Sequence, residues 1–381
     1  RFECSSLADW SRIDVSRVPL YLNADAPLAC ALHEALTLRV AKTGIRFPGD
    51  ADRRPLDARF AVCGFSQDEA LLPESGSFSG YQLLLEYFSF REKFMSVTLR
   101  GLENVNFPEV LAWFEIDIVL EKQWPHEYAL SEKNLRLHCA PVINLFPLES
   151  DPLHLDSLQT EYLLRPMRIQ DGHTEIYSVD SVTSSRHSGH QMYVPFTSFR
   201  HKGGMLRHDA PEYYYHTRVK PGPSGLHDTW LMLGGEAFDN HSVPEHEKLS
   251  LSLTGTNGQL PRRALQSALL DTVVKSTATP IQVRNLCAPT LPCYPPDRDR
   301  FHWRVLSHLG SSFLWMMDNA DVLRGALALY DWTDNEMNRR RLEAIVDVRH
   351  SEVERFAQGH FLRGVQIEVT LDSSGLDRKS T

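Results

Sequence analysis

A strict alternation of apolar and polar residues around position 250 constrains the fold of this chain more than any other feature. The stretch "LSLSLT" places Leu249, Leu251 and Leu253 on one side of an extended backbone, which is typical of a strand with one buried face. Asn257-Gly258 follows immediately, and this dipeptide marks a tight turn. Further strand patterns, such as "LRLHCAPVINLF", "EIYSVDSV" and "TWLML", recur from about residue 135. The middle of the chain is therefore predicted to be rich in β-strands.

Helical periodicity is found toward the two ends of the chain. A helix is predicted after Asp25, where Pro27 suits a first turn. A second buried helical stripe consists of Tyr81, Leu84, Leu85 and Phe88. Two amphipathic patterns near the C-terminus carry Trp303, Leu306, Leu309 and Phe313 on one stripe, and Val322, Leu323, Ala326, Leu327 and Tyr330 on the other. With "FEIDIVLE" and "FLRGVQIEVTLD" as strands, we predict an α+β, β-rich protein with mixed or antiparallel sheets and a few amphipathic helices.

Domain boundaries are suggested by changes in sequence texture. The 381 residues exceed one ordinary domain. We expect an N-terminal α+β domain at 1–134, a β-rich domain at 135–296 and a C-terminal helical pair with strands at 297–381. Long exposed connections are expected between 183 and 228 because that stretch is rich in Ser, Gly, Pro and His. The chain opens "RFECSSLADW" without Met, so we expect its N-terminus to be missing.

Composition excludes several classes of protein. The chain is 42% hydrophobic and 23% charged, which is typical of a globular protein. Its formal charge of −9, from 40 Lys+Arg against 49 Asp+Glu, argues against nucleic-acid binding. The consecutive Arg339–Arg341 are interpreted as a solvated helix face. No apolar run reaches the roughly 20 residues of a membrane span. The six cysteines fit no zinc pattern and are expected to be free thiols in a reducing compartment.

The segment "VINLFPLESDPLHLDSLQTEY", residues 142–162, packs four carboxylates and a histidine into about twenty positions. It contains Glu149, Asp151, His154, Asp156 and Glu161. An active site, a metal site and a protein-binding surface are all conceivable. Glycosidic cleavage needs two carboxylates across a sugar-binding cleft. Because prolines flank Glu149 and Asp151, we expect irregular backbone here, with Asp151 bonding its own backbone in a turn.

Other candidate sites are weak. His187 and His190, like His241 and His246, could bind a metal. However, H-x-x-H in a Ser/Gly loop lacks the helical i, i+4 geometry and the nearby carboxylate of an H-E-x-x-H site. Glu245 beside His246 comes nearest to a ligand pair. No G-x-S-x-G elbow and no phosphate-binding glycine loop are present. The sequence therefore predicts no catalytic residue, no cofactor site and no metal site.

A run of three tyrosines, Tyr213, Tyr214 and Tyr215, precedes Arg218. These rings could stack on sugars or bases. They could equally form a strand with alternate rings buried and a partner docked on the rest. Aromatic residues and arginine are what protein interfaces favour, so we predict a partner interface here.

Several stretches taken together resemble the TssF family (also called VasA or ImpG) of the bacterial type VI secretion system. "YQLLLEYFSFREKF" follows the family run Y-x-L-L-x-E-Y-F-x-F-P-x-K-F, with Arg91 where the family usually has proline. The others, in order, are "CAPVINLFPLESDPLHLD", "EYLLRP" with "EIYSVDSV", "TGTNGQLP", "VRNLCAPTLPCYPP", "HWRVLSHL", "LALYDW" and "FLRGVQIEVTLD". Each motif is weak by itself. Their order and spacing across roughly residues 20–372 make the combination specific.

The resemblance implies a non-enzymatic wedge subunit of the secretion baseplate. In that family two TssF copies embrace one TssG chain, TssG carries TssK adaptors, TssE links the wedge to the sheath, and wedges surround the spike hub. The resemblance thus implies assembly at the cytoplasmic face of the inner membrane, with indirect membrane contact only. It implies no cofactor, no nucleic acid and no small-molecule substrate. A β-rich carbohydrate-active hydrolase using Glu149 or Asp151, and a glycan-binding module using Tyr213–Tyr215, stay open as alternatives.

On this resemblance the carboxylate-rich segment has a structural role. Asn144, Phe146, Pro147 and Asp151 would fix a bend where the chain enters its β-rich half. Asn144 and Asp151 would satisfy backbone groups locally, and Phe146 would anchor the bend in the core. Glu149 and Glu161 would face solvent or a partner. Asn257 and Gly258 would form a structural turn.

Overall fold

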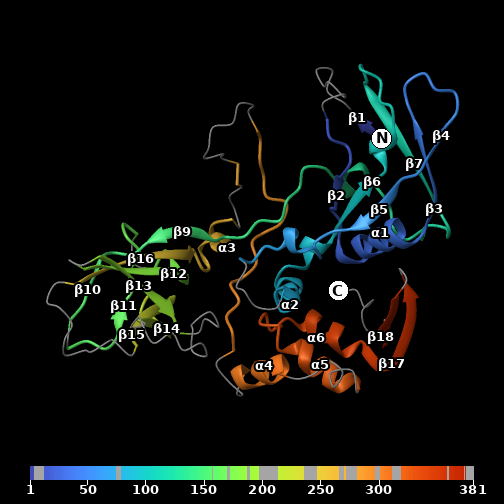
Figure 1. Ribbon diagram of the computed structural model, residues 1–381. Coiled ribbons are helices and arrows are strands. Elements are labelled where there is room, and N and C mark those ends of the chain that lie inside the picture. The colour runs from blue at the N-terminus through green and yellow to red at the C-terminus, as the bar shows by residue number, and fades with distance from the viewer. Residues whose placement is uncertain are drawn as a thin grey trace. The chain divides into compact units, whose positions relative to one another are not determined.

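Two units make up the computed structural model of the chain (Figure 1). The first combines residues 1–142 with 293–381, and the second comprises 143–292. The structure describes residues 1–3, 13–73, 79–156, 158–169, 172–186, 189–196, 213–235, 247–265, 270–271, 281–296, 301–310, 319–357, 360–372 and 374. The division into three domains expected from the sequence stays a prediction.

Two four-stranded antiparallel sheets form the N-terminal part of the first unit, in the orders β1-β7-β3-β4 and β5-β6-β2-β8. Their strands are β1 (Phe2–Glu3), β2 (Val18–Leu22), β3 (Val40–Arg46), β4 (Arg54–Leu56), β5 (Arg59–Val62), β6 (Ser96–Arg100), β7 (Trp113–Leu120) and β8 (Leu135–Arg136). Helix α1 (Ala26–Leu38) begins after Asp25 with a proline in its first turn, as predicted. Its residues Leu32 and Leu36 pack into one core with Val97 and Leu99 of β6.

The predicted helix over the second stripe is α2 (Ser79–Ser89), which leads into the 3-10 turn η3 (Arg91–Phe94). Short 3-10 turns also occur at η2 (Gln67–Glu69), η4 (Leu102–Asn104) and η5 (Glu132–Asn134). Phe88 of α2 packs in one cluster with Phe301, Leu329 and Tyr330. The first unit is therefore closed by contacts between sequence-distant helices.

The C-terminal helices are α4 (Phe301–Gly310), α5 (Ala320–Ala328) and α6 (Glu336–Glu343). The stripe expected on α4 does not form the buried side: Trp303 and Leu306 are exposed. Phe301 and Val305, one turn apart, face the α2 cluster instead. Phe313 and the Leu309 side chain lie outside the described residues. On α5 the expected Leu323 and Ala326 are buried.

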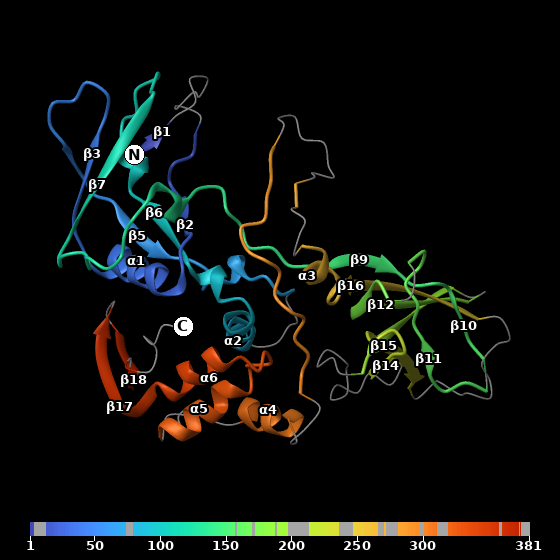
Figure 2. The ribbon, with the colours of Figure 1, turned by 180° about the vertical axis from the view of Figure 1, so that it is seen from behind.

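The C-terminal strands form a long two-stranded antiparallel hairpin, β17 (Ile345–Ala357) with β18 (His360–Leu371). At its base Ile345 and Val348 pack against Ala320 and Leu323 of the α5 region. In both ribbon views α5 and α6 lie beside this base (Figures 1 and 2). "FLRGVQIEVTLD" is thus a strand, as predicted.

The second unit is an eight-stranded mixed sheet in the order β10-β16-β12-β13-β14-β15-β11, with β9 also paired to β16. Its elements are β9 (Phe146–Glu149), β10 (Leu153–His154), β11 (Tyr162–Leu163), β12 (Glu175–Arg186), β13 (Gly189–Pro195), β14 (Tyr214–Pro221), β15 (His227–Gly234), β16 (Lys248–Thr256) and α3 (Leu260–Ala264). The pairing of β13 with β14 is parallel. Leu249, Leu251 and Leu253 are all buried, so the alternation in β16 is confirmed. With its several sheets and few helices, the chain has the predicted α+β, β-rich fold.

This sheet curls around a single core. The Tyr215 hydroxyl on β14 donates to the Val179 carbonyl on β12, 2.9 Å away, although β13 separates these strands in the sheet order. Buried side chains of β15 and β16 share the same cluster. A curled sheet buries the alternate side chains of its strands without needing a covering helix.

Two backbone expectations were wrong. Residues 146–149 are a strand rather than irregular, with Pro147 opposite Thr254. Proline is tolerated there because β9 pairs with β16 on one side only, so no ladder hydrogen bond is lost on the other. In the stretch 183–228, expected to be long connections, the described residues lie mostly in strands β12 to β15, and residues 187–188 and 197–212 lie outside the described residues.

Candidate functional site

Asn144 joins the entrance of the carboxylate-rich segment to the turn after β16. Its Oδ1 accepts hydrogen bonds from the Asn257 backbone N–H at 2.7 Å and from the Thr256 hydroxyl at 3.0 Å. Its Nδ2 donates to Asn257 Oδ1 at 3.2 Å. Gly258 has a φ of +54°, which glycine adopts at little cost. Asn144 thus satisfies a backbone group, but one 113 residues away rather than a local one.

The other residues assigned to the bend differ in burial. Phe146 is half-buried on β9 opposite Gly255, whereas Leu148 is the β9 side chain that packs against the core. A Cβ at position 255 would collide with Leu148, so glycine makes room for it. Asp151 is exposed, and its backbone N–H donates to the Arg165 carbonyl at 2.9 Å. The bend assigned to Asn144, Phe146, Pro147 and Asp151 stays a prediction.

The carboxylates of this segment diverge rather than converge. Glu149 and Asp151 are exposed, and Asp156 accepts the Leu158 backbone N–H at 3.0 Å. Glu161 forms ion pairs with Lys220 at 2.5 Å and Arg218 at 3.8 Å. The hydrogen bond from Lys220, assisted by the charges of both cations, holds the pKa of Glu161 below its usual value. The segment therefore contributes surface contacts and no pair of acids across a cleft.

The tyrosine run divides between the core and the surface. Tyr213 and Tyr215 are only 8% and 5% exposed and belong to the core cluster, so neither ring is open to a partner. Tyr214 is half-buried and lies 6.2 Å from the exposed Phe196 ring. Arg218 is largely exposed beside Glu161. Of the predicted interface, the structure leaves Tyr214 and Arg218 accessible, and their contact with a partner stays a prediction.

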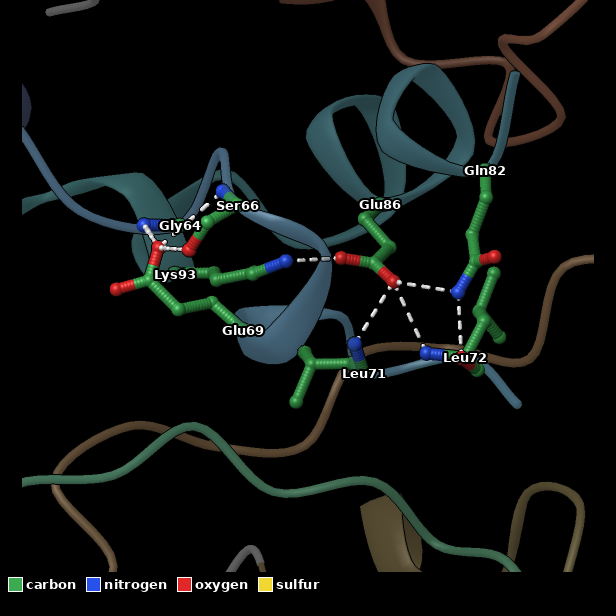
Figure 3. Close-up of polar contacts among 8 residues, drawn as sticks. All are labelled: Gly64, Ser66, Glu69, Leu71, Leu72, Gln82, Glu86 and Lys93. Atoms are coloured by element: carbon green, nitrogen blue, oxygen red, sulfur yellow. Dashed lines mark hydrogen bonds and ion pairs between the residues drawn. The ribbon is translucent and has the colours of Figure 1, made fainter. Parts of the chain in front are cut away.

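A buried ion pair in the first unit was not anticipated from the sequence. Glu86 of α2 and Lys93 of η3 pair with side chains only 4% and 2% exposed (Figure 3). The other Glu86 oxygen accepts the backbone N–H groups of Leu71 and Leu72 at 2.8 and 2.9 Å. Gln82, one turn earlier on α2, donates to the Leu72 carbonyl. One carboxylate therefore fastens a loop, a helix and a 3-10 turn together.

Glu69, also in Figure 3, caps the turn next to this pair. Its Oε2 accepts the Gly64 and Ser66 backbone N–H groups and the Ser66 hydroxyl. Burial acts to raise the pKa of Glu69, but the hydrogen bonds from Ser66 and Gly64 outweigh it and keep the pKa low. The carboxylate is therefore held in its charged form as a structural acceptor.

Asn338 is a second buried polar anchor in this unit. It is almost fully buried, and its Nδ2 donates to the Phe88 carbonyl at 3.0 Å, 250 residues away in sequence. Its Oδ1 accepts from Arg341 at 2.7 Å. Of the arginine run interpreted as a solvated helix face, Arg339 and Arg340 are exposed on α6, whereas Arg341 is half-buried. Asn338 ties α6 to the end of α2.

Neither anchor offers a reaction centre. Among the described residues no group of three or more His, Cys, Asp or Glu side chains is placed to hold a metal ion. Of the histidine pairs considered from the sequence, His187, His241 and His246, with Glu245, lie outside the described residues, and His190 lies on β13 opposite Ser185. A shallow hollow of about 270 Å³ between α1 and β5 is lined mostly by apolar atoms, including those of Leu38, Val62 and Met95. The five cysteines that the structure describes form no disulfide with one another. No helix in the described ranges has both the length and the apolar character to span a membrane.

The chain is similar to components of one secretion machine. A family model described as "Type VI secretion system, TssF" matches residues 1–381. Type VI secretion system component TssF1 of Pseudomonas aeruginosa is 26% identical over 384 residues, which cover 94% of this chain and 61% of the relative. The chain thus spans about three-fifths of the curated relative that it matches.

Two solved structures are also similar. One is the TssK-TssF-TssG baseplate subcomplex of the type VI secretion system, determined by cryo-electron microscopy. Its matching chain has a TM-score of 0.86 and 56% identity, over 98% of this chain and 68% of that one. The other is the baseplate complex of the type VI secretion system, with a TM-score of 0.69 and 55% identity over 100% and 65%.

Proposed function

Because this chain belongs to the TssF family of the type VI secretion system, we propose that it is a non-enzymatic wedge subunit of the secretion baseplate. The observation that carries the proposal is the match to a chain of the TssK-TssF-TssG subcomplex at 56% identity and a TM-score of 0.86. At that identity, over nearly the whole chain, surfaces as well as fold are expected to be retained. The proposed partners are therefore TssG and TssK.

A second TssF copy, TssE and the spike hub complete the proposed set of partners. They follow from family membership, as does the proposed location at the cytoplasmic face of the inner membrane. The residues proposed to contact partners in the second unit are Tyr214 and Arg218, because both are accessible on β14. The chain takes no cofactor in this proposal.

A structural role fits the arrangement of the polar groups better than either alternative. A hydrolase would need two acids across a cleft, whereas Glu149 and Asp151 are exposed beside an edge strand. A glycan-binding platform would need an exposed aromatic row, whereas Tyr213 and Tyr215 are buried. The half-buried Glu69 accepts hydrogen bonds from backbone N–H groups, and the buried Glu86 accepts them from backbone N–H groups and pairs with a lysine, so both acids stabilise the fold.

Native mass spectrometry of this chain co-expressed with TssG would test the proposal. We expect a stable species containing two copies of the chain and one TssG. A monomer that ignores TssG would contradict the proposal. Binding with another stoichiometry would retain TssG as a partner and reject the expected pair of copies.

A further inference from the structure

One face of the β17–β18 hairpin carries an apolar stripe along β18. Strand partners in register share a face, and so do residues two apart along a strand. The apolar residues of this face of β18 are Phe361, Val365, Ile367, Val369 and Leu371, which we call the β18 stripe, and Arg363 lies between Phe361 and Val365. On β17 the same face carries Val348, His350, Glu352, Glu354 and Phe356. The apolar stripe on β18 therefore lies beside the polar side chains of His350, Glu352 and Glu354 on β17.

Most of this stripe is open to solvent. Phe361 and Leu371 are 78% and 63% exposed, and Ile367 and Val369 are 40% and 42% exposed. Phe356, whose ring meets that of Phe361 edge to face with the two centroids 5.1 Å apart, is 66% exposed. An isolated two-stranded ribbon is only marginally stable in water. A row of exposed apolar side chains such as Ile367, Val369 and Leu371 is typical of a contact site.

The helix that already covers part of this face shows what kind of element fits it. Val348, at the base of β17, is only 4% exposed because Ala320 and Leu323 at α5 pack on it. Its cross-strand partner Val369 lies on β18, beyond the cover of α5. Here a helix packs on one face of the two-stranded hairpin. It covers the base of β17 and leaves β18 uncovered.

We propose that the β18 stripe is the docking site of an amphipathic helix from a partner subunit, which lies beside α5 and carries Lys or Arg along the edge facing β17. The proposal rests on the proposed function, since it supplies a contact element for the baseplate assembly. From Phe361 to Leu371 the stripe is about 34 Å long at ~3.4 Å per residue. A helix of roughly 20 residues matches that length, whereas the nine residues of α5 span only about 13 Å.

The charged residues of the hairpin indicate which charge the docked helix should carry. Glu354 pairs with Arg363 at 2.9 Å on this face. Glu352 has no ion-pair partner among the described residues. This leaves one uncompensated carboxylate beside the stripe, so a basic residue at the edge of the docked helix would be attracted to it. Two hairpins facing each other would bring like charges together, which disfavours a second copy of this chain as the occupant.

Site-specific photo-cross-linking can identify the occupant. A photoreactive residue would replace Ile367 in the full chain, bound to purified TssG and TssK. The matched control replaces Gln366, the next residue on β18, which faces the opposite side. We expect position 367 to cross-link to a helical segment of TssG or TssK with basic residues beside its apolar face, and position 366 to give no such product.

Affinity provides the second readout. Ile367→Asp with Val369→Asp should weaken binding of TssG–TssK by at least about tenfold, as loss of a central apolar contact does. Gln366→Asp with Thr370→Asp should leave it unchanged. The thermal unfolding of the free chain should be the same for both pairs, because all four side chains are exposed before assembly.

Each other outcome overturns the proposal. Cross-linking to a second copy of the chain, or to an extended strand, would give the stripe a different occupant. Normal TssG–TssK binding by the Ile367/Val369 variant without any cross-link would leave the proposed function standing and reject the docking site. If the unmodified chain fails to bind TssG–TssK, the proposed function fails and the docking proposal fails with it.

Discussion

Residues 81–94 and residues 142–162 place their charged groups in opposite ways. The first segment has four charged residues, and two of them, Glu86 and Lys93, are buried together and hydrogen-bonded. The second also has four carboxylates, but these are exposed or paired at the surface. A cluster of ionisable residues in the sequence therefore does not by itself identify the groups on which the structure depends. Burial and hydrogen bonding identify them.

The buried pair should give the largest effect. We expect Lys93→Met to destabilise the first unit by about 3 kcal/mol or more, because it leaves the Glu86 carboxylate buried without its cation. Urea unfolding would measure the loss. A double variant, Glu86→Gln with Lys93→Met, removes the orphaned charge and should recover part of it. A loss below about 1 kcal/mol for the single variant would mean that the pair matters no more than a surface one.

The polar junction of the second segment should give a smaller effect. Asn144→Ala removes the acceptor of the Asn257 N–H and of the Thr256 hydroxyl at a site open to water, so about 1 kcal/mol should be lost. Asn144→Asp keeps that acceptor and should retain most of the stability in the same urea experiment. Equal losses for the two variants would show that the accepted hydrogen bonds are unimportant.

Glu161 should show a still smaller, pH-dependent effect. Its pKa is lowered by Lys220, so the folded state favours the charged carboxylate more than the unfolded state does. The resulting stabilisation is complete above the ordinary pKa of about 4.5 and disappears as the pH falls through the lowered folded value. Thermal unfolding of Glu161→Gln should therefore occur below that of the unmodified chain at pH 7, and the difference should disappear once the pH lies below the lowered pKa of Glu161. A difference that persists at low pH would exclude this electrostatic origin.

Asp151 should give the smallest effect. Its side chain is exposed, and the hydrogen bond at this position comes from the backbone. We expect Asp151→Asn to change the free energy of unfolding by less than about 0.5 kcal/mol. Differential scanning calorimetry of the variant and the unmodified chain at neutral pH would measure this change. A loss as large as that of Asn144→Ala would mean that the carboxylate fixes the bend after all.

Periodicity predicts the elements whose environment is regular. The alternation at Leu249–Leu253 and the stripe of α2 each correspond to one buried face, so their secondary structure follows from the sequence. Strands β12 and β15 follow from "EIYSVDSV" and "TWLML", whereas the end of β12 and the whole of β13 were missed because Ser, Gly and His are frequent there, and those residues are also common in loops. Pro147 suggested irregular backbone, although at the edge of a sheet it costs no ladder hydrogen bond.

The site residues are harder to predict because their partners are distant in sequence. The residues around Asn144 do not indicate that it will bond to Asn257, and those around Phe88 do not indicate that it will bond to Asn338. Glu86 and Lys93 did carry a signal, since both occupy fixed positions of the motif in "YQLLLEYFSFREKF". A charged position fixed within an otherwise aromatic and aliphatic motif is a sign of a buried, bonded charge.

The second unit is inserted between the two parts of the first, so the ribosome completes the second unit before it completes the first. The Phe88 carbonyl cannot meet Asn338 until 250 further residues have been added. At ribosomal rates of about 5–20 residues per second, that wait lasts roughly 12–50 s. During that interval the Phe88 side of α2 lacks Phe301, Leu329 and Tyr330, while every strand of the second unit is already available to pair. The inserted unit can therefore mature first, and the nascent α2 must be kept from aggregating until the chain is nearly finished.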